Sequence, residues 1–166
     1  MFKVNFKNTL INTIIVLTIF LLDRVTKIYI INLGESANVV DIYLTSYLNL
    51  YLIWNKGIAF GLFSSDQNII YNLVTTLIGM LTLIILYIIT KTKDFRVYFF
   101  ILIVGGALGN LYDRLYYSAV PDFIDFHINN FHWFIFNVAD IFISIGVLCL
   151  ILAEFFYNKN ETNEKK

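Results

Sequence analysis

The chain has 166 residues, of which 58% are hydrophobic and 14% are charged, and its mean hydropathy is +0.72. A soluble globular domain has about 45–50% apolar and about 25% charged residues, so this composition argues against a water-soluble fold. The formal net charge is zero, which gives no indication of nucleic-acid binding. The single cysteine, Cys149, excludes an internal disulfide. Because the two histidines, His127 and His132, form no HExxH motif, we expect no metal site, and we expect no cofactor.

Four apolar stretches follow one another along the chain, and each is close to the roughly 20 residues that a helix needs to cross a bilayer. They cover residues 9–31, 69–90, 97–115 and 136–157. Lys3 and Lys7 precede the first stretch as in a signal peptide, but this stretch contains charged residues and lacks an Ala-x-Ala cleavage signal. We therefore interpret it as a retained helix and predict a single all-α polytopic membrane domain with four transmembrane helices.

The basic residues are concentrated on one side of these stretches. Eight of the twelve Lys and Arg precede the first stretch, join the second to the third, or follow the fourth. The segments 32–68 and 116–135 together contain a single basic residue, Lys56. Because basic residues favour the cytoplasmic side, we expect both termini in the cytoplasm and both of these segments outside.

The first outer segment is rich in β-branched and aromatic residues from Asn38 to Phe63. Partial alternation from Tyr43 to Leu52 predicts short strands at the membrane interface, ended by turn residues at 55–57. An interfacial helix that only anchors the protein is the alternative interpretation. Asn55 offers an amide that can hydrogen-bond a peptide backbone, which by itself is a weak signal.

Charged side chains inside the first stretch share a helix face. Asp23 and Lys27 are four residues apart, in the order that favours an ion pair within a helix. Together with Arg24 they can brace the bundle, extend outward to the interface, or position groups near a site. The sequence leaves these alternatives open.

The third stretch contains a G-x-x-x-G pattern, Gly105 and Gly109, which is typical of close helix packing. Asn110, Asp113 and Arg114 follow on roughly one face. Ion pairing is the simpler interpretation of the adjacent Asp113 and Arg114, whereas Arg114 with Asn110 can hold a carboxylate or a substrate carbonyl. In the fourth stretch a second polar face recurs at spacings of three and four, formed by Asn137, Asp140 and Ser144.

Two carboxylates at a membrane surface suffice for peptide hydrolysis without a metal or a nucleophile. One activates a water while its protonated partner polarises the carbonyl, because like charges about 3 Å apart share a proton. A carboxylate near hydrocarbon costs free energy and therefore indicates a function, which makes Asp140 one candidate for the catalytic pair. Asp122 and Asp125 lie in the same short loop sequence, PDFID, and the residues alone do not separate them as its partner.

Three other classes of function remain open. A small transporter or channel subunit would also bury ionisable residues, but we find no repeat between the two halves of the chain. A Ser/Lys peptidase would use Ser64 or Ser65 with Lys56, although nothing in their spacing favours it. A purely structural membrane protein would need no acidic pair that faces outward.

The chain resembles bacterial lipoprotein signal peptidase (signal peptidase II) along almost its whole length, through five blocks in the same order. The matching residues are Asp23 with Thr26-Lys27, Asn55-Lys56-Gly57-Ile58-Ala59-Phe60-Gly61, Gly105-Gly106-Ala107 with Gly109-Asn110 and Asp113-Arg114, Asp122-Phe123 with Asp125-Phe126, and Phe136-Asn137-Val138-Ala139-Asp140. One departure is Val120-Pro121, where the family usually has two aliphatic residues. Proline fixes φ and removes a donor before Asp122 but leaves both carboxylates in place.

The resemblance implies an intramembrane aspartic endopeptidase with four transmembrane helices and a small extracytoplasmic β-cradle, located in the bacterial inner membrane. It implies cleavage of the signal peptide of prolipoproteins just before a diacylglyceryl-modified cysteine, and inhibition by globomycin. The implied partners are these substrates and membrane lipids, without nucleic acid. Because one chain supplies the whole site, we expect a monomer.

The resemblance also implies a role for each residue that matches the family's motifs. Asp122 and Asp140 are the implied catalytic pair, which favours Asp122 over Asp125. The implied substrate-binding residues are Asn55, Gly57, Asn110, Arg114, Asn137 and Ala139. The implied supporting residues are Asp23, Lys27 and Asp113, and no metal ligand is implied.

Overall fold

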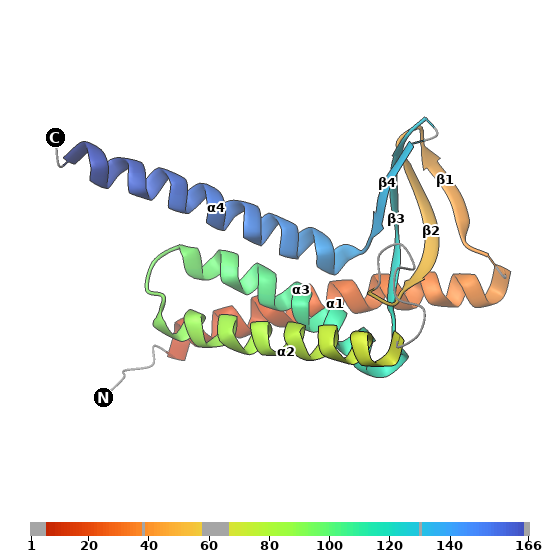
Figure 1. The fold of residues 1–166 in the computed structure, drawn as a ribbon, viewed down its shortest axis with the longest axis horizontal. Helices are drawn as coiled ribbons and strands as arrows, with labels where there is room; N and C mark the ends of the chain where they lie inside the picture. The colour runs from red at the N-terminus through yellow and green to blue at the C-terminus, as the bar shows by residue number, and fades with distance from the viewer. Residues whose placement is uncertain (1–5, 38, 58–66, 130, 165–166) are drawn as a thin grey trace.

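The computed structural model of the chain describes residues 6–37, 39–57, 67–129 and 131–164. Along the chain, one strand pair follows the first helix and a second strand pair precedes the last helix, with two consecutive helices between the pairs (Figure 1). The helices are α1 (Phe6–Ala37), α2 (Gln67–Lys91), α3 (Arg96–Tyr117) and α4 (Val138–Glu164). The strands are β1 (Asp41–Thr45), β2 (Leu48–Asn55), β3 (Val120–Ile128) and β4 (Phe131–Phe136).

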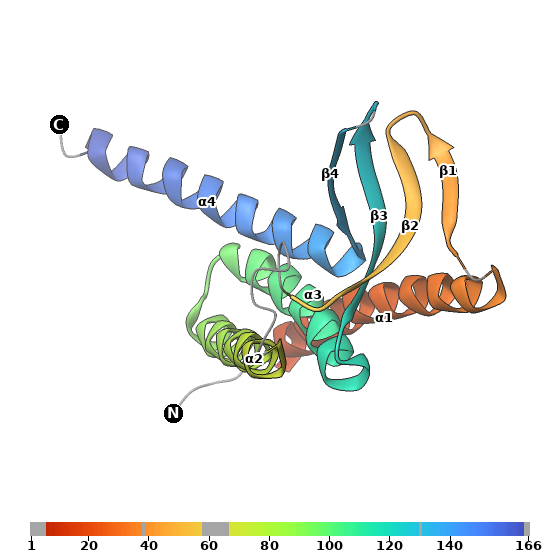
Figure 2. The same ribbon diagram turned by 45° about the vertical axis from the view of Figure 1, so that its right-hand side comes forward.

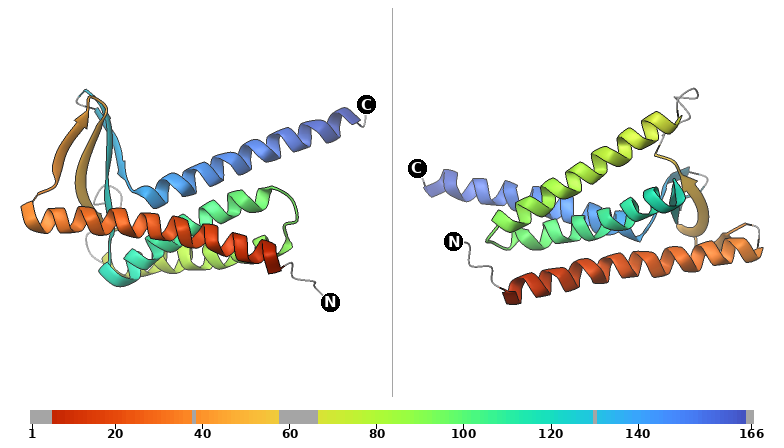
Figure 3. Two further views of the ribbon diagram at one scale, coloured as in Figure 1. Left: turned by 180° about the vertical axis from the view of Figure 1, so that it is seen from behind. Right: turned by 90° about the horizontal axis from the view of Figure 1, so that it is seen from below.

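The sheet stands over one end of the helices, where the C-terminal part of α1 passes beneath it (Figures 1 and 2). The start of α1, the connection from α2 to α3, and the end of α4 lie at one end, and the sheet stands at the other (Figures 1 and 2). α3 contacts α1, α2 and α4. α4 begins beside the sheet and diverges from the other helices toward its C-terminal end (Figure 3).

Two helices of the described chain are long and apolar enough to cross a membrane. They cover Ile69–Lys91 and Val138–Phe156. Only 6% and 11% of the residues in their most apolar windows are buried within the molecule. The core helix of a soluble protein would be largely buried, so these exposed apolar surfaces fit a lipid environment.

Close packing of α3 against α1 depends on the two glycines of the predicted G-x-x-x-G pattern. A Cβ on Gly105 would lie 2.8 Å from Cβ of Ile19, and one on Gly109 would lie 2.5 Å from Oδ2 of Asp23. Neither distance is a possible van der Waals contact. The pattern therefore marks a real helix interface, and Gly109 lets the α3 backbone approach a buried carboxylate.

The strands form one antiparallel sheet in the order β1-β2-β3-β4. The strands predicted in the first outer segment are confirmed as β1 and β2, and β2 ends at Asn55 as predicted. The prediction of a short loop in segment 116–135 is wrong, because most of it forms β3 and β4. Its β-branched and aromatic residues have the composition of a strand, so Asp122 and Asp125 lie on one strand.

Pro121 occupies β3 although β3 is an inner strand of the sheet. Proline lacks the N–H that an inner strand uses for pairing, so it is normally confined to edges. Here β4 pairs with β3 only from Ile124 onward, and Pro121 faces only Trp54 of β2. This part of β3 has one free edge, which explains why proline is tolerated immediately before Asp122.

A small apolar cluster holds the sheet against the helices. Its buried members are Ile30 of α1, Val40 just before β1, and Phe123 of β3. Partly buried side chains from α1, β2, β3 and α4 pack around them, namely Leu33, Leu50, Leu52, Ile124 and Val138. Phe123 follows Asp122 directly, so this packing fixes the strand that carries the carboxylate.

Candidate active site

Asp122 lies on β3 and is almost fully buried, with 2% of its surface exposed. Its two carboxylate oxygens accept hydrogen bonds from two amides. Asn55 Nδ2 donates to Oδ2 at 2.9 Å, and Asn137 Nδ2 donates to Oδ1 at 2.6 Å. Asn55 comes from the end of β2 and Asn137 from the residue before α4, so three elements of the fold meet at this carboxylate.

Asp140 lies in the first turn of α4 and forms a reciprocal cap with Asn137. The backbone N–H of Asp140 donates to Oδ1 of Asn137 at 3.1 Å, and the backbone N–H of Asn137 donates to Oδ2 of Asp140 at 3.1 Å. This is a capping box, in which each residue satisfies a backbone donor of the other. The Asn-x-x-Asp spacing thus starts the helix, and it also orients the Asp140 carboxylate.

Asn137 connects the two candidate carboxylates. Its side-chain amide donates to Asp122 and its backbone amide donates to Asp140. Asn137 is fully buried, so both interactions are shielded from solvent. One residue therefore holds the acidic groups of β3 and α4 at a common position.

Burial raises the pKa of Asp122 to about 6, because it penalises the charged form of the carboxyl group. The hydrogen bonds from Asn55 and Asn137 lower this pKa, and the nearby charge of Asp140 raises it. The burial effect dominates. Near neutral pH a fraction of Asp122 is consequently protonated, as a shared-proton pair requires.

A buried cluster of charged side chains lies between α1 and α3, and we call it the ionic cluster. Lys27 Nζ donates to Asp23 at 2.9 Å, to Asp113 at 2.7 Å and to Asn110 at 2.8 Å. Arg24 Nη2 lies 2.5 Å from Oδ1 of Asp113. Two acids thus face two bases, and all three protons of the Lys27 ammonium have an acceptor. A cluster balanced in this way avoids the cost of an unpaired buried charge.

The ionic cluster is connected to the candidate dyad by two hydrogen bonds. Asn110 accepts from Lys27 and donates through Nδ2 to Oδ1 of Asp140 at 2.8 Å. The other oxygen of Asp23 accepts the backbone N–H of Ala139 at 3.0 Å. Asp23 therefore caps the first turn of α4, and Lys27 orients the amide that holds Asp140.

Arg114 lies at the end of α3 beside the turn after β2. A Cβ on Gly57 would lie 2.8 Å from Nη1 of Arg114, and Gly57 has a φ of 75°, a conformation that side chains disfavour. Tyr71 donates to the carbonyl of Arg114 at 2.8 Å. Nε and Nη1 of Arg114 are buried and have no hydrogen-bond partner among the described residues. The guanidinium thus has donors left for a ligand.

The structure brings most of the predicted site residues together. Asn55, Asn110, Asn137 and Asp140 form one hydrogen-bonded network with Asp122. Ala139, predicted to bind substrate, is fully buried beneath Asp23. Residues 58–61 of the matching block, and the alternative nucleophiles Ser64 and Ser65, lie outside the described residues.

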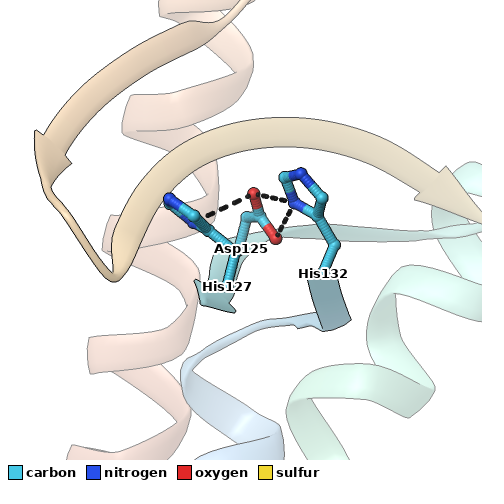
Figure 4. Close-up of side chains that lie close together, drawn as sticks. All are labelled: Asp125, His127 and His132. Atoms are coloured by element: carbon cyan, nitrogen blue, oxygen red, sulfur yellow. Dashed lines mark hydrogen bonds and ion pairs between the residues drawn. The ribbon is translucent and has the colours of Figure 1, made fainter. Parts of the chain in front are cut away.

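A group of side chains that can bind a metal, which the sequence did not lead us to expect, lies on β3 beyond Asp122 and on β4. Asp125 is hydrogen-bonded to His132 and lies near His127 (Figure 4). The search for HExxH could not find this group, because its histidines lie on paired strands rather than on a helix. The signal in the sequence is Asp125-x-His127, which places two ligands on one strand face, followed by His132 across a tight turn.

A sequence model of the family described as Signal peptidase (SPase) II matches residues 15–156 of the chain. The chain belongs to the signal peptidase II family. A protein named lipoprotein signal peptidase from Pelagibacter ubique (strain HTCC1062) is 58% identical over 163 residues, covering 98% of this chain and 98% of that protein. A protein of the same name from Francisella tularensis subsp. novicida (strain U112) is 42% identical over 150 residues, covering 88% of this chain and 92% of its own length.

A solved bacterial membrane enzyme has a similar fold, with a TM-score of 0.70 and 30% sequence identity over 96% of this chain and 95% of that one. The family consists of aspartic endopeptidases, so the chain is a membrane hydrolase of lipoprotein processing, as predicted. The alternative of a small transporter or channel subunit has no support in these comparisons. The family assigns the chemistry, and the hydrogen-bonded network above brings the predicted carboxylates of Asp122 and Asp140 to one place.

Proposed function

We propose that this chain cleaves the signal peptide from prolipoproteins just before a diacylglyceryl-modified cysteine, with Asp122 and Asp140 as its catalytic dyad. The observation that carries this proposal is the double role of Asn137, which donates to both carboxylates from a fully buried position. The named relatives support the choice of substrate, because they are lipoprotein signal peptidases.

In this mechanism the two carboxylates share one proton and use one water. Asp140 accepts a proton from the water as its oxygen bonds to the scissile carbonyl carbon, and Asp122 donates its proton to the carbonyl oxygen. The resulting diol collapses and the C–N bond breaks. The proton on Asp140 passes to the departing nitrogen, and a diol proton returns to Asp122, which restores the starting state.

The assignment of the starting proton to Asp122 rests on the surroundings of the two groups. Burial raises the pKa of Asp122 to about 6, which favours its protonated form. Asp140 lies in the first turn of α4, where the partial positive charge of the helix N-terminus stabilises negative charge. Burial of Asp122 thus favours it as the acid, which leaves Asp140 as the base of the dyad.

The remaining polar residues have proposed roles around this pair. Asn55 and Asn110 orient the carboxylates and, with Gly57, Arg114, Asn137 and Ala139, form the side of the site that receives the substrate. The Arg114 donors that have no partner among the described residues suit a peptide carbonyl or a lipid ester oxygen. Asp23, Lys27 and Asp113 support the site from the ionic cluster.

The membrane placement is part of the proposal. All four helices cross the bilayer of the bacterial inner membrane, with both termini in the cytoplasm and the sheet on the outer side. The position of the α2–α3 connection supports this, because it lies at the same end as the start of α1 and the end of α4 (Figure 1). Lys91, Lys93 and Arg96 are located there, where basic residues favour the cytoplasm. One chain supplies every proposed site residue, so the enzyme acts as a monomer among lipids.

The test is a cleavage assay with purified protein in detergent and two forms of one prolipoprotein, with and without the diacylglyceryl group. We expect cleavage of the modified form only, with a new N-terminus at the modified cysteine when the product is measured by mass spectrometry. Asp140→Asn keeps the shape of the side chain and should give no product, whereas Cys149→Ser, in the middle of α4, should match the wild type.

Two results would contradict the proposal. Equal cleavage of the unmodified prolipoprotein would show that the enzyme does not recognise the diacylglyceryl group. Cleavage by Asp140→Asn would show that catalysis does not need the proposed dyad. A folded wild type that cleaves neither form would contradict the proposed substrate itself.

A further inference from the structure

A cluster of three side chains that can bind a metal lies on β3 and β4, and we call it the hairpin cluster. It consists of Asp125, His127 and His132, whose ligand atoms all lie within 4.8 Å of one another. His132 Nδ1 lies 2.8 Å from Oδ2 of Asp125, and His127 Nδ1 lies 3.7 Å from the same oxygen. Figure 4 shows the Asp125 carboxylate between the two imidazole rings.

The pairing of β3 with β4 explains why these residues meet. Asp125 and His127 are two apart on β3, so they point to the same face of the sheet, and both are buried while Phe126 between them is exposed. His132 on β4 lies directly opposite His127 in the register. A register irregularity at Phe126/His127 accompanies this pairing. Irregularities of this kind re-aim side chains.

His127 provides an independent sign of a missing ligand. Its side chain is 9% exposed, and its Nδ1 is buried without a hydrogen-bond partner among the described residues. The 3.7 Å separation from Asp125 is too long for a hydrogen bond. A buried polar atom without a partner costs free energy and calls for an explanation.

Asn49 of β2 provides a second sign on the same sheet. It lies directly opposite Asp125 in the β2–β3 register, and opposed residues of antiparallel strands point to the same face. Its Oδ1 is also buried and without a hydrogen-bond partner in the described part of the chain. His127 and Asn49, which neighbour Asp125 along β3 and across to β2, therefore each hold a buried polar atom without a partner among the described residues.

A simple Asp–His pair does not account for this arrangement. It would explain the contact between Asp125 and His132, but it would leave His127 Nδ1 and Asn49 Oδ1 without partners. A cation placed among the ligand atoms of Asp125, His127 and His132, which lie within 4.8 Å of one another, gives His127 Nδ1 a partner, because a metal accepts electron pairs from imidazole nitrogen and from carboxylate oxygen.

We propose that the hairpin cluster binds one divalent transition-metal ion of the zinc class, with Asp125, His127 and His132 as ligands. Two imidazoles and one carboxylate suit Zn²⁺, which favours four-coordinate sites with such donors. Ligand atoms about 3.4 Å apart surround a tetrahedral zinc ion with bonds of about 2.1 Å, so the observed separations need only small side-chain rotations. His132 is 55% exposed, which leaves a path by which the ion enters.

The ion stabilises the sheet rather than taking part in the cleavage. Its ligands join β3 to β4, and His132 lies on the edge strand of the sheet. Asp125 lies three residues beyond Asp122 on an extended strand, a separation of roughly 10 Å along the chain. The hairpin cluster shares no hydrogen-bond partner with the dyad, as far as the described residues go.

The test is Zn²⁺ binding to the whole chain, purified in detergent without a histidine tag and freed of metal with a chelator. The background is low because the sequence contains only two histidines and one cysteine. Titration calorimetry should give one ion per chain, and elemental analysis after dialysis should give the same ratio. Zn²⁺ should also raise the thermal unfolding temperature of the wild type.

The variants separate ligation from folding. His132→Gln changes an exposed side chain and should weaken Zn²⁺ binding at least about tenfold, and Asp125→Asn should do the same. Asp41→Asn, on exposed β1 of the same sheet, and Cys149→Ser should bind as the wild type does. The absence of saturable binding would overturn the proposal, as would equal affinity in wild type and His132→Gln. Neither result depends on cleavage, so the proposed function is tested separately.

Discussion

Asp122 and Asp125 lie three residues apart on β3, and both are 2% exposed, but their surroundings differ. Asp122 is held by the amides of Asn55 and Asn137, which come from β2 and from the start of α4. Asp125 faces the imidazoles of the hairpin cluster. The two carboxylates therefore share a strand and a degree of burial, and they differ in the chemistry of their partners.

The difference shows how partners decide what a buried carboxylate can do. Amides donate hydrogen bonds without supplying a charge or a titrating group, so the proton of Asp122 stays available for exchange with Asp140 and a substrate. Imidazoles can share a proton with a carboxylate or bind a metal beside it. The amide partners of Asp122 thus fit its proposed role in proton transfer, and the imidazole partners of Asp125 fit the metal site proposed for it.

The largest expected effect comes from removing the second carboxylate of the dyad. Asp140→Asn should lower kcat/KM by at least about a thousandfold, since general acid–base catalysis is worth roughly 10²–10⁴ and the remaining carboxylate has no partner. The cleavage assay measures this effect. Insertion and thermal unfolding should stay close to wild type, because the amide can still accept the backbone N–H of Asn137. Activity within tenfold of wild type would contradict the dyad.

Asn137 should have the next largest effect, because it serves the helix and the carboxylate together. Asn137→Ala removes the cap of α4, worth about 1 kcal/mol of stability. It also removes the side-chain donor that holds the Asp122 carboxyl group, a loss worth about ten- to a hundredfold in activity. Asn137→Ser keeps a capping oxygen and removes the amide donor. Both variants should lose cleavage, and only Asn137→Ala should lose unfolding free energy in a denaturation experiment. A fully active Asn137→Ser would show that the amide donor is dispensable.

The pH dependence sharpens the assignment of Asp122 as the proton donor. Its pKa is raised to about 6, so the protonated form is present below that pH and is lost as the pH rises through it. The kcat/KM of the wild type should therefore fall on the alkaline side. Asn55→Ala removes a hydrogen bond that lowers this pKa, so the alkaline limb should move to higher pH by up to about one unit. A shift of the alkaline limb to lower pH would contradict the assignment of Asp122 as the proton donor, even if the maximal kcat/KM of the variant also changes.

The smallest expected effect comes from Cys149→Ser. The thiol is partly buried in α4 and belongs neither to the dyad nor to the hairpin cluster. The substitution should change the cleavage rate by less than about twofold, since changes away from special sites are usually within about 0.5 kcal/mol. A large loss of activity in a folded variant would reveal a role for the middle of α4 that neither carboxylate explains.

Local patterns predicted the apolar helices and the first two strands well. The run PDFID was predicted as a loop, although the aromatic and β-branched residues around Asp125 favour β structure. Asp122 and Asp125 could not be separated by residue type or burial. The separation comes from Asn55, 67 residues before Asp122, and from Asn137, 15 residues after it. Such partners are set by the tertiary fold, and only the resemblance to a family anticipated them.

The most direct test of the account compares Asp122→Asn with Asp125→Asn in one cleavage assay, on the same diacylglyceryl-modified prolipoprotein. The two substitutions replace the same kind of carboxyl group by an amide, on the same strand and at equal burial. The account predicts no cleavage by Asp122→Asn and substantial cleavage by Asp125→Asn. Equal loss in both variants, with both folded, would contradict it, because the partners of the two carboxylates would then not determine their roles.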